Sequence, residues 1–264
     1  MPPVSPLLTV MVGAARKAGR SLARDFGEVE NLQVSKKGPS DFVTAADRKA
    51  EDILFTELNR VRPGYGFLME ERGAVEGSDK THRWIVDPLD GTLNFLHGMP
   101  HYAISIGLER DGEMVAGVVY DLSRAEIFSA ERGRGAFLND RRLRVAGRTK
   151  IEESVIATGI PYHGKAGHEA FLKELAAISN KVAGVRRFGS AALDMAWVAA
   201  GRFDAFWERG LQPWDIAAGI VLVREAGGFV RGLDGGDPIQ GDLLAGNAAL
   251  TPVFADLLTK AKKA

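Results

Sequence analysis

The sequence predicts a mixed α/β (α+β) protein with a layered αβαβα sandwich fold. In residues 1–147, two amphipathic helical segments precede a run of short strands joined by turns, which is typical of helices packed on an antiparallel sheet. In residues 148–264, strand and helix alternate, which favours a mixed or parallel sheet. No Ser-rich or Pro-rich linker separates the halves, so we expect them to pack as one unit.

The composition is that of a soluble globular protein. The chain has 264 residues, 45% of them hydrophobic, and its 34 basic residues balance 34 acidic ones. Neutrality argues against a protein that mainly binds nucleic acid or an anionic membrane. The absence of cysteine excludes disulfides, thiolate zinc sites, iron–sulfur clusters and cysteine nucleophiles. Because no apolar run reaches the ~18 residues that span a bilayer and no export signal is evident, we expect a cytoplasmic protein without membrane contact.

The N-terminal segment has the signals of a core helix. Ser5 is a suitable N-cap and Pro6 a suitable first residue, and apolar residues recur at helical spacing as far as Leu22. A polar loop or hairpin is expected at 31–41 because Lys36-Lys37-Gly38-Pro39 is rich in turn-forming residues.

A second helix and a series of strands complete the first half. Thr44 predicts the N-cap of a helix from about Ala45 to Val61, which Pro63-Gly64 ends. Arg110-Asp111-Gly112 predicts a hairpin turn between two strands. Strands are expected at 66–69, 84–87, 101–109, 113–120 and 125–130.

The second half begins with an apolar strand at 154–159. Its remaining strands are expected at 203–208 and 243–245, and its helices at 167–180, 190–200, 215–226 and from Thr251 onward. Gly201 and Gly227-Gly228 suit the C-terminal ends of two of these helices.

Two acids follow directly on a buried strand. Trp84-Ile85-Val86 is apolar, and Asp87 and Asp90 come next, separated by Pro-Leu. Carboxylates in such a place need a cation to offset the loss of hydration. Mg²⁺ prefers oxygen ligands, and the chain offers neither cysteine nor a paired-histidine helix for zinc. Gly91-Thr92 then begins a turn or helix whose N–H groups could hold a phosphate beside the metal.

Two further acidic positions could complete a site for two or three metals. Glu70-Glu71 ends a short strand, and Asp215, after Trp214, opens a helix. Either position alone is ordinary, since acids are common at helix starts. Their combination with Asp87 and Asp90 indicates a hard-metal site.

These blocks resemble those of the inositol monophosphatase family, which are Mg²⁺-dependent, lithium-sensitive phosphatases. The resemblance covers most of the chain and its blocks occur in the family's order. It rests on Phe42–Asp47, Glu70-Glu71, Asp87-Pro88-Leu89-Asp90-Gly91-Thr92 with Asn94-Phe95, Gly135–Asn139, Gly189–Ala192, Trp214–Gly219 and Glu225–Gly228.

The resemblance implies two to three Mg²⁺ ions in the active site. Glu70, Asp87 and the backbone carbonyl of Leu89 would bind one ion. Asp87, Asp90 and Asp215 would bind a second, and a third, weaker ion would lie near Glu70. Direct attack by a metal-activated water on a phosphomonoester follows from such a site, without a covalent phosphoenzyme.

The resemblance also assigns roles to groups around the metals. Glu70 and Thr92 would orient and deprotonate the attacking water, and Asp47 would support Thr92. The N–H groups of Gly91 and Thr92 would hold the phosphate. Lys36 would lie on a mobile loop near the third metal.

The implied substrate is inositol monophosphate or a similar sugar or polyol phosphate. Glu208 and Ala191 would contact its hydroxyls, with Asp215 beside them. Relatives handle fructose 1,6-bisphosphate, adenosine 3′,5′-bisphosphate, NADP and histidinol phosphate, and these substrates remain alternatives. The resemblance also implies a homodimer. Arg72 stands where the family has a small hydroxyl residue, which could alter the weakest metal site or contact an anionic substrate, and Ser190 replaces a threonine.

Two segments of the sequence imitate motifs of other phosphate-handling proteins. Asp87-x-x-Asp90-Gly-Thr is one residue longer than the Asp-x-Asp-Gly-Thr nucleophile motif of haloacid-dehalogenase-type phosphatases, and that alternative leaves Trp214-Asp215 unexplained. Gly159-x4-Gly164-Lys165-Ala166 resembles a P-loop, but Ala166 has no oxygen to hold Mg²⁺, so a connecting loop is the better interpretation.

A basic stretch surrounds residues 135–139. The simple interpretation is a solvated hairpin, and the alternative, which some bacterial relatives suggest, is a surface that binds RNA or a transcription factor in addition to catalysis. Its members are Arg132, Arg134, Arg141, Arg142, Arg144, Arg148 and Lys150.

Overall fold

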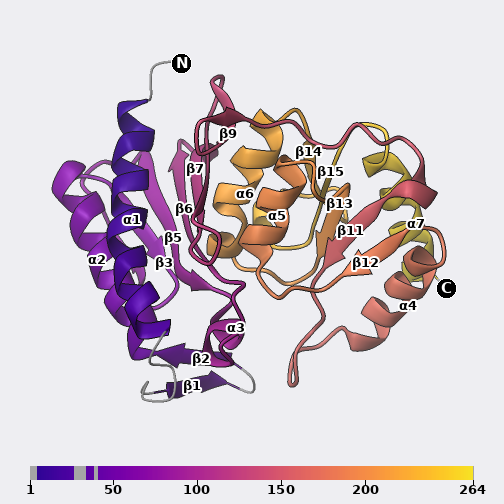
Figure 1. The fold of residues 1–264 in the computed structure, drawn as a ribbon, viewed down its shortest axis with the longest axis horizontal. Helices are drawn as coiled ribbons and strands as arrows, with labels where there is room; N and C mark the ends of the chain where they lie inside the picture. Colours follow the sequence, from indigo (N-terminus) through magenta and orange to yellow (C-terminus); the bar gives the residue numbers. More distant parts are fainter. Residues whose placement is uncertain (1–4, 27–33, 39–40, 264) are drawn as a thin grey trace.

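The structure, a computed structural model, describes residues 5–26, 34–38 and 41–263, and the side chains of 34–38, 41–43 and 263 are outside this description. Figure 1 shows five layers in the order helices, sheet, helices, sheet, helices. The predicted αβαβα sandwich is thereby confirmed. None of the described helices has the length and apolar character needed to cross a membrane.

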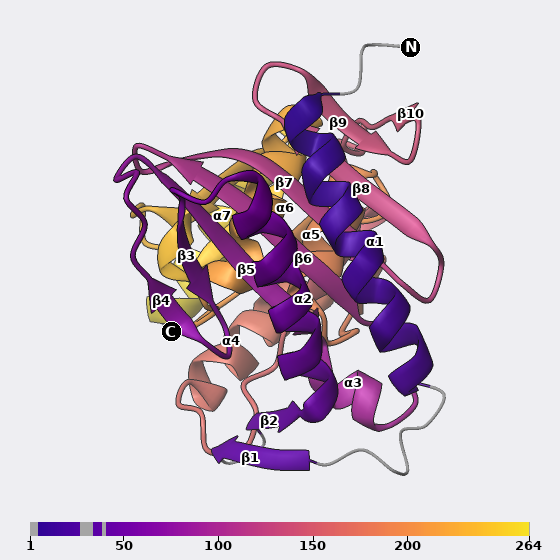
Figure 2. The ribbon, with the colours of Figure 1, turned by 90° about the vertical axis from the view of Figure 1, so that its left-hand side faces the viewer.

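The first layer consists of α1 (Pro6–Phe26) and α2 (Ala45–Val61), which lie across one face of the first sheet (Figure 2). Ser5 caps α1 by accepting the Leu7 N–H at 3.2 Å. Thr44 caps α2 through a capping box with Asp47. Both helices therefore begin where the sequence predicts. Their apolar faces bury Met11, Leu22 and Leu54 against this sheet.

The first large sheet has eight strands in the order β10-β9-β8-β7-β6-β5-β3-β4. All neighbours are antiparallel except β3 and β5, which are parallel because β4 is inserted at the sheet edge between them in sequence. The expected antiparallel sheet needs this one correction. The strands are β3 (Gly66–Met69), β4 (Gly73–Val75), β5 (His82–Asp90), β6 (Ala103–Arg110), β7 (Glu113–Asp121), β8 (Glu126–Glu131), β9 (Gly135–Leu138) and β10 (Arg141–Arg142).

A small hairpin and a short helix lie near one end of this sheet. The hairpin pairs β1 (Val34–Gly38) with β2 (Asp41–Thr44), which is consistent with the hairpin expected at 31–41, although 31–33 and 39–40 lie outside the described residues. The helix α3 (Thr92–Leu96) directly follows β5.

The middle layer contains α5 (Ala191–Ala199) and α6 (Pro213–Glu225), which lie between the two sheets (Figure 1). Glycines on the first sheet allow α6 to approach closely. A Cβ on Gly117 would lie 2.5 Å from the carbonyl oxygen of Ala218, and one on Gly107 would lie 2.7 Å from the Cβ of Ala217. Helices of the second half therefore cover the sheet of the first half.

The second sheet has five strands in the order β12-β11-β13-β15-β14. The first three of these are mutually parallel, and the last two are antiparallel to their neighbours, so the predicted mixed sheet is observed. The strands are β11 (Val155–Thr158), β12 (Gly184–Arg186), β13 (Ala205–Glu208), β14 (Phe229–Gly232) and β15 (Leu243–Gly246).

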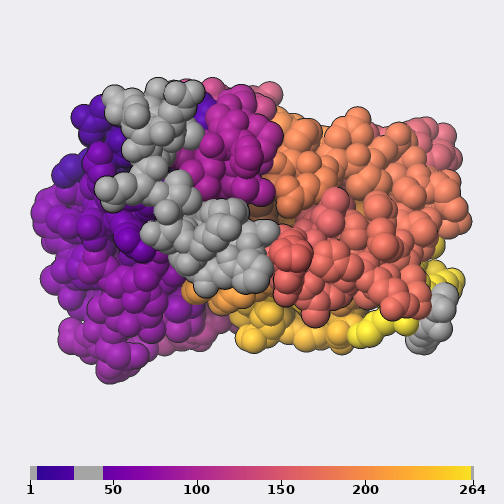
Figure 3. Space-filling view, turned by 90° about the horizontal axis from the view of Figure 1, so that it is seen from below, coloured from indigo at the N-terminus to yellow at the C-terminus, as the bar shows by residue number. Residues whose placement is uncertain are grey.

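The last layer, α4 (His168–Ser179) and α7 (Thr251–Lys263), covers the outer face of the second sheet. Short 3-10 turns at Ile151–Glu153 and Pro238–Gln240 complete the elements. The boundary predicted between 147 and 148 falls in the segment that leads from β10 to β11. Viewed from below, the two halves abut directly (Figure 3).

Candidate active site

An irregularity in β5 brings its two aspartates together. In a regular strand, residues three apart point to opposite faces. Here the pairing of β5 with β6 shifts between Asp87, which is opposite Ser105, and Asp90, which is opposite Ala103. Three steps along β5 thus match two along β6, as in a β-bulge, and this extra residue redirects Asp90. The Leu89 N–H donates to Asp87 Oδ1 at 2.8 Å and holds the bulge in place.

Asp215 completes a cluster of three carboxylates. It lies in the first turn of α6, where its Oδ2 accepts the Gln212 N–H at 2.7 Å. One carboxylate oxygen from each of Asp87, Asp90 and Asp215 lies within 4.8 Å of the others. The structure therefore brings together three predicted metal ligands that are separated by up to 128 residues in sequence, 215 − 87.

The three carboxyl groups are electrostatically strained without a cation. Burial, followed by the charges of neighbouring acids, raises the pKa of Asp87 and of Asp215 well above the ordinary value. Burial also raises the pKa of Asp90 to about 6, although hydrogen bonds from Ser190 and from the Ala192 N–H oppose this shift. A divalent cation bound to these oxygens would remove the repulsion, so the donor set fits Mg²⁺.

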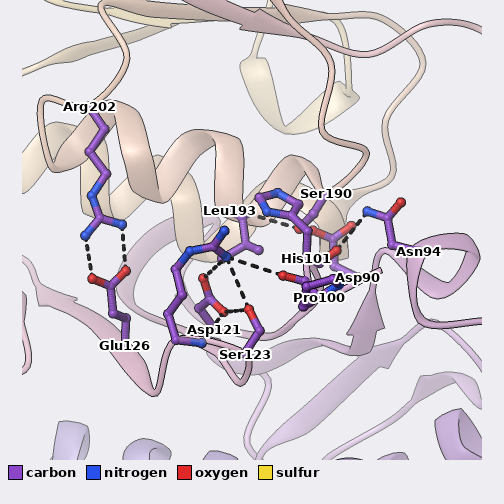
Figure 4. Close-up of polar contacts among 11 residues, drawn as sticks. Asp90, Asn94, Pro100, His101, Asp121, Ser123, Glu126, Ser190, Leu193 and Arg202 are labelled. Carbon is purple, nitrogen blue, oxygen red and sulfur yellow. Dashed lines mark hydrogen bonds and ion pairs between the residues drawn. The ribbon is translucent and has the colours of Figure 1, made fainter. Parts of the chain in front are cut away.

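The N-terminus of α5 holds Asp90. Asp90 Oδ2 accepts hydrogen bonds from Ser190 Oγ and, at 2.8 Å, from the Ala192 N–H. Ser190 is also the N-cap of α5. Nearby, the buried amide of Asn94 donates to the carbonyl of His101 at 2.8 Å (Figure 4). It also donates to the carbonyl of Phe188 at 2.8 Å, so it fixes the chain that leads into Ser190. A ligand from the first sheet is thus positioned by a helix of the second half.

Asp47 and Thr92 form the hydrogen-bonded pair that the resemblance implies. Thr92 Oγ1 lies 3.2 Å from Asp47 Oδ1 and 2.9 Å from the carbonyl oxygen of Leu89. Asp47 Oδ2 accepts the Thr44 N–H at 2.9 Å and the Thr44 hydroxyl. Burial raises the pKa of Asp47, and the hydrogen bonds from Thr44 counteract it. The capping box of α2 therefore orients a residue of the site.

Glu70 lies beside Asp87, but it is not one of the three clustered carboxylates. Its N–H donates to the carbonyl of Val86 at 3.2 Å, and its side chain hydrogen-bonds Asp87, which contributes to the raised pKa of Asp87. Sequence reasoning missed the residue that holds this turn. The buried carboxylate of Glu51 accepts the Glu71 N–H at 2.8 Å, and only its position on the inner face of α2 indicates this role.

Glu208 and Asp194 form a second acidic wall. Glu208 ends β13, and its carboxylate lies so close to Gly159 that a Cβ there would be 1.9 Å from Oε1. Burial raises the pKa of Glu208 to about 7, against the charges of Lys165 and Arg187. Asp194, on α5, was not predicted. It is 2% exposed, its Oδ1 has no hydrogen-bond partner among the described residues, and burial raises its pKa.

Gly91 and Ala191 lie at the helix starts beside Asp90. Gly91 has φ of 88°, and a Cβ there would lie 3.0 Å from the His101 carbonyl, so glycine is required. The backbone N–H groups of both residues lower the pKa of Asp90, so they lie near its carboxylate. The phosphate contact of the Gly91 N–H stays a prediction.

Two other predicted positions lie at the margin of the site or outside it. Lys36 lies on β1, but its side chain is outside the described residues. Arg72 contacts α2, because its Nη2 is 2.5 Å from Asp52 Oδ1 and its guanidinium lies 4.3 Å from the centre of the Phe55 ring. Its suggested effect on the weakest metal site or contact with an anionic substrate stays a prediction.

Three of the seven residues of the basic stretch form ion pairs. Arg134 pairs with Glu131, Arg148 with Asp204 and Lys150 with Glu153. Arg141 and Arg142 are exposed on the edge strand β10.

The fold and the carboxylate site together agree with one family of phosphatases. The profile of the inositol monophosphatase family matches residues 4–263, and the chain belongs to this family. It is 64% identical over 248 residues to the inositol-1-monophosphatase of Mesorhizobium japonicum, which covers 93% of each chain. It is 43% identical to the Nus factor SuhB of Escherichia coli K12, with 92% of this chain and 91% of that one covered.

Solved structures agree with the same assignment. The crystal structure of the extragenic suppressor protein suhB from Bartonella henselae superposes with a TM-score of 0.94. It has 56% sequence identity, covering 97% of this chain and 99% of that one.

Proposed function

We propose that this protein hydrolyses inositol monophosphate or a closely similar polyol or sugar phosphate in a Mg²⁺-dependent reaction. The single observation that carries the proposal is the convergence of Asp87, Asp90 and Asp215 within 4.8 Å, beside Glu70 and Thr92. The inositol-1-monophosphatase of Mesorhizobium japonicum supports the choice of substrate.

The proposed ligands divide between two ions. The first ion is held by Glu70, Asp87 and the Leu89 carbonyl. The second ion is held by Asp87, Asp90 and Asp215, and a third, weaker ion lies near Glu70. When bound, Mg²⁺ lowers the pKa of the attacking water and stabilises the charge that develops on the phosphate and on the leaving oxygen. An oxygen-only donor set of this kind is what Mg²⁺ requires.

The protein groups position the reactants and move the proton. The Thr92 hydroxyl, oriented by Asp47 and the Leu89 carbonyl, faces the place of the attacking water. Glu70 accepts the proton of this water. The N–H groups of Gly91 and Thr92 contribute to phosphate binding. Glu208, Ala191 and Asp215 bind the polyol side of the substrate, and Lys36 belongs to the mobile loop near the third ion.

The test is phosphate release from myo-inositol 1-phosphate with Mg²⁺, with and without Li⁺, by the wild type and by Asp90→Asn. We expect a Li⁺-sensitive activity that falls by about 10³-fold in the variant, because a ligand of the charge-stabilising cation is lost. Thermal unfolding confirms that the variant is folded. A folded Asp90→Asn protein with full activity would contradict the two-metal arrangement, and a phosphoenzyme trapped on Asp87 would favour the haloacid-dehalogenase-type alternative.

We also propose that the protein is a cytoplasmic homodimer, and its membership of this family supports the dimer. Three large apolar side chains are exposed near the His101–Trp197 aromatic cluster, Leu93 by 41%, Met99 by 45% and Phe188 by 37%. Burial of such a patch against a second copy stabilises a dimer. Sedimentation at micromolar concentration tests this, with twice the chain mass as the expected result.

A second role, in binding RNA or the transcription machinery, is favoured by the exposed Arg141 and Arg142 of β10. The Nus factor SuhB of Escherichia coli supports it as an addition to catalysis. We expect salt-dependent RNA binding that is lost in Arg141→Glu/Arg142→Glu, while phosphate release is unchanged.

A further inference from the structure

The turn between β3 and β4 consists of Glu70, Glu71 and Arg72 and lies near the edge of the first sheet. The N–H of Glu70 points into this sheet, where it donates to the Val86 carbonyl at 3.2 Å. The N–H groups of Glu71 and Arg72 instead donate to Glu51 Oε2 on α2, at 2.8 and 3.3 Å. The turn is therefore held between the sheet and a single carboxylate of the helix.

Glu51 is well placed to hold this turn. It is 3% exposed and lies on the buried face of α2, which packs against the first sheet. Burial raises the pKa of Glu51, and the N–H groups of Glu71 and Arg72 oppose this shift. Removal of the carboxylate would leave these two N–H groups without their acceptor, which is costly in a folded protein. The carboxylate therefore determines where the turn lies relative to α2.

Arg72 adds a second attachment of the turn to α2. Its Nε is 3.7 Å from Glu51 Oε1, and its Nη2 is 2.5 Å from Asp52 Oδ1. Its guanidinium carbon lies 4.3 Å from the centre of the Phe55 ring. Ion pairs of exposed groups such as Asp52 are weak because solvent screens them, whereas the hydrogen bonds to the buried Glu51 are charge-assisted. Glu51 thus makes the stronger contact, and Arg72 supports it.

The same helix also orients Thr92. Asp47 accepts the Thr92 hydroxyl at 3.2 Å and lies four residues before Glu51, on the same face of α2. Four residues of an α-helix span about 6 Å, so the two carboxylates lie on adjacent turns. Thr92 and Glu70 are the two groups proposed to act on the attacking water, and their relative position therefore depends on one helix.

We propose that Glu51, supported by Arg72, is a positioning residue for the Mg²⁺ ion assigned to Glu70, Asp87 and the Leu89 carbonyl. This inference rests on the proposed function. Mg²⁺ requires nearly ideal octahedral geometry, so its affinity depends on where each ligand is held. Loss of a group that orients a metal ligand accordingly weakens metal binding.

The test measures Mg²⁺ binding by isothermal titration calorimetry and the exchange of the Glu71 amide proton in the metal-free protein. We expect Glu51→Ala to lower the Mg²⁺ affinity by about 10- to 100-fold. Its Glu71 amide should exchange about tenfold faster than in the wild type, because the acceptor is gone. Phosphate release should require more Mg²⁺, while the substrate KM at saturating Mg²⁺ changes by less than about twofold.

Two smaller changes test the contact between Glu51 and Arg72. Glu51→Gln keeps an oxygen that can accept the Glu71 N–H but loses the attraction to Arg72, so we expect a loss of Mg²⁺ affinity of about twofold to fivefold. Arg72→Ser should cause a similar loss. The double variant should lose less affinity than the product of the two single losses, because both changes remove the same contact.

Asp204→Ala is the matched control. Asp204 is also a buried carboxylate, and it accepts hydrogen bonds from the Val155 N–H at 2.9 Å and from Arg148 Nε at 2.7 Å. It precedes β13, so it lies at the edge of the second sheet opposite to Glu208. This variant should lose thermal stability as Glu51→Ala does, but its Mg²⁺ affinity and the amide exchange of the turn should remain those of the wild type.

The outcomes separate this inference from the proposed function. A folded Glu51→Ala or Glu51→Gln protein that binds Mg²⁺ as tightly as the wild type would overturn the positioning role, and so would an equal loss of affinity in Asp204→Ala. If the wild type binds Mg²⁺ but releases no phosphate, the proposed function fails alone, because calorimetry and amide exchange still decide this inference. A wild type that does not bind Mg²⁺ would overturn both. Thermal unfolding shows that each variant is folded.

Discussion

Ser190 illustrates how a single hydroxyl determines the geometry of the site. It caps α5 and at the same time donates to Asp90, so the helix start and the proposed metal ligand have one common partner. Mutation of a group that orients a metal ligand typically lowers metal affinity by about 10- to 100-fold. The conservative replacement of threonine by serine at this position retains that function.

We therefore expect Ser190→Ala to weaken Mg²⁺ binding by about 10- to 100-fold. The measurement is the Mg²⁺ concentration that gives half-maximal phosphate release. Ser190→Thr is the control and should remain close to wild type, because its hydroxyl can make the same hydrogen bond. An alanine variant with unaltered Mg²⁺ dependence would show that Asp90 is held by the Ala192 N–H alone.

At the scale of elements, α6 has the central position. Asp215 lies in its first turn, and its buried residues pack against both sheets. The approach to the first sheet depends on Gly107 and Gly117, since any side chain there would overlap α6. Tight packing of this helix is therefore tied to the placement of one proposed metal ligand.

Gly117→Ala should destabilise the protein by about 1–3 kcal/mol, because overpacking a tight contact moves the backbone. It should also raise the Mg²⁺ requirement, since α6 carries Asp215. Gly13→Ala is the control. Gly13 is exposed on α1 with no heavy atom within 4 Å of an added Cβ, so alanine there should stabilise by up to about 1 kcal/mol. Thermal unfolding measures both, and a Gly117→Ala protein as stable as wild type would contradict the packing argument.

Element boundaries were predicted best where local chemistry defines them. The starts of α1 and α2 follow from Ser5 and Thr44, whose side chains bond the helix N–H groups. The strands that the sequence failed to predict, β4, β12 and β14, have three or four residues each. Such short strands have too few residues for a recognisable alternation, and they are strands only because a longer neighbour pairs with them.

At the scale of the whole molecule, the zero net charge conceals a concentrated negative site. Asp87, Asp90 and Asp215 come from both halves of the chain and meet where the layers join. Each has a raised pKa in the folded protein, so each destabilises the folded state when it ionises. When a cation is bound at the site, ionisation of these carboxylates stabilises the folded state instead.

The metal-free protein should thus lose stability as the pH rises. The pKa of Asp90 is raised from 3.8 to about 6, so its stabilising, protonated form is fully present below the ordinary pKa and is lost as the pH passes about 6. The proposed Mg²⁺ would bind the ionised form, so the gain in unfolding temperature on adding it should grow between about pH 5 and about pH 8. Asp90→Asn should reduce this growth. A gain that does not depend on pH would contradict the assignment of these carboxylates to the metal.

The sequence by itself determined the fold class, most helix boundaries and the identity of the acids. These follow from local causes, because capping, helical periodicity and the apolar run before Asp87 each act over a few residues. The tertiary structure alone decided that a bulge turns Asp90 toward Asp87, that Ser190 and α5 hold it, and that Glu51 holds the turn at Glu70. It also placed Arg72 on α2 and brought Lys165 and Arg187 to Glu208. These are contacts between residues far apart in the chain, and their geometry depends on how the two sheets pack on α5 and α6.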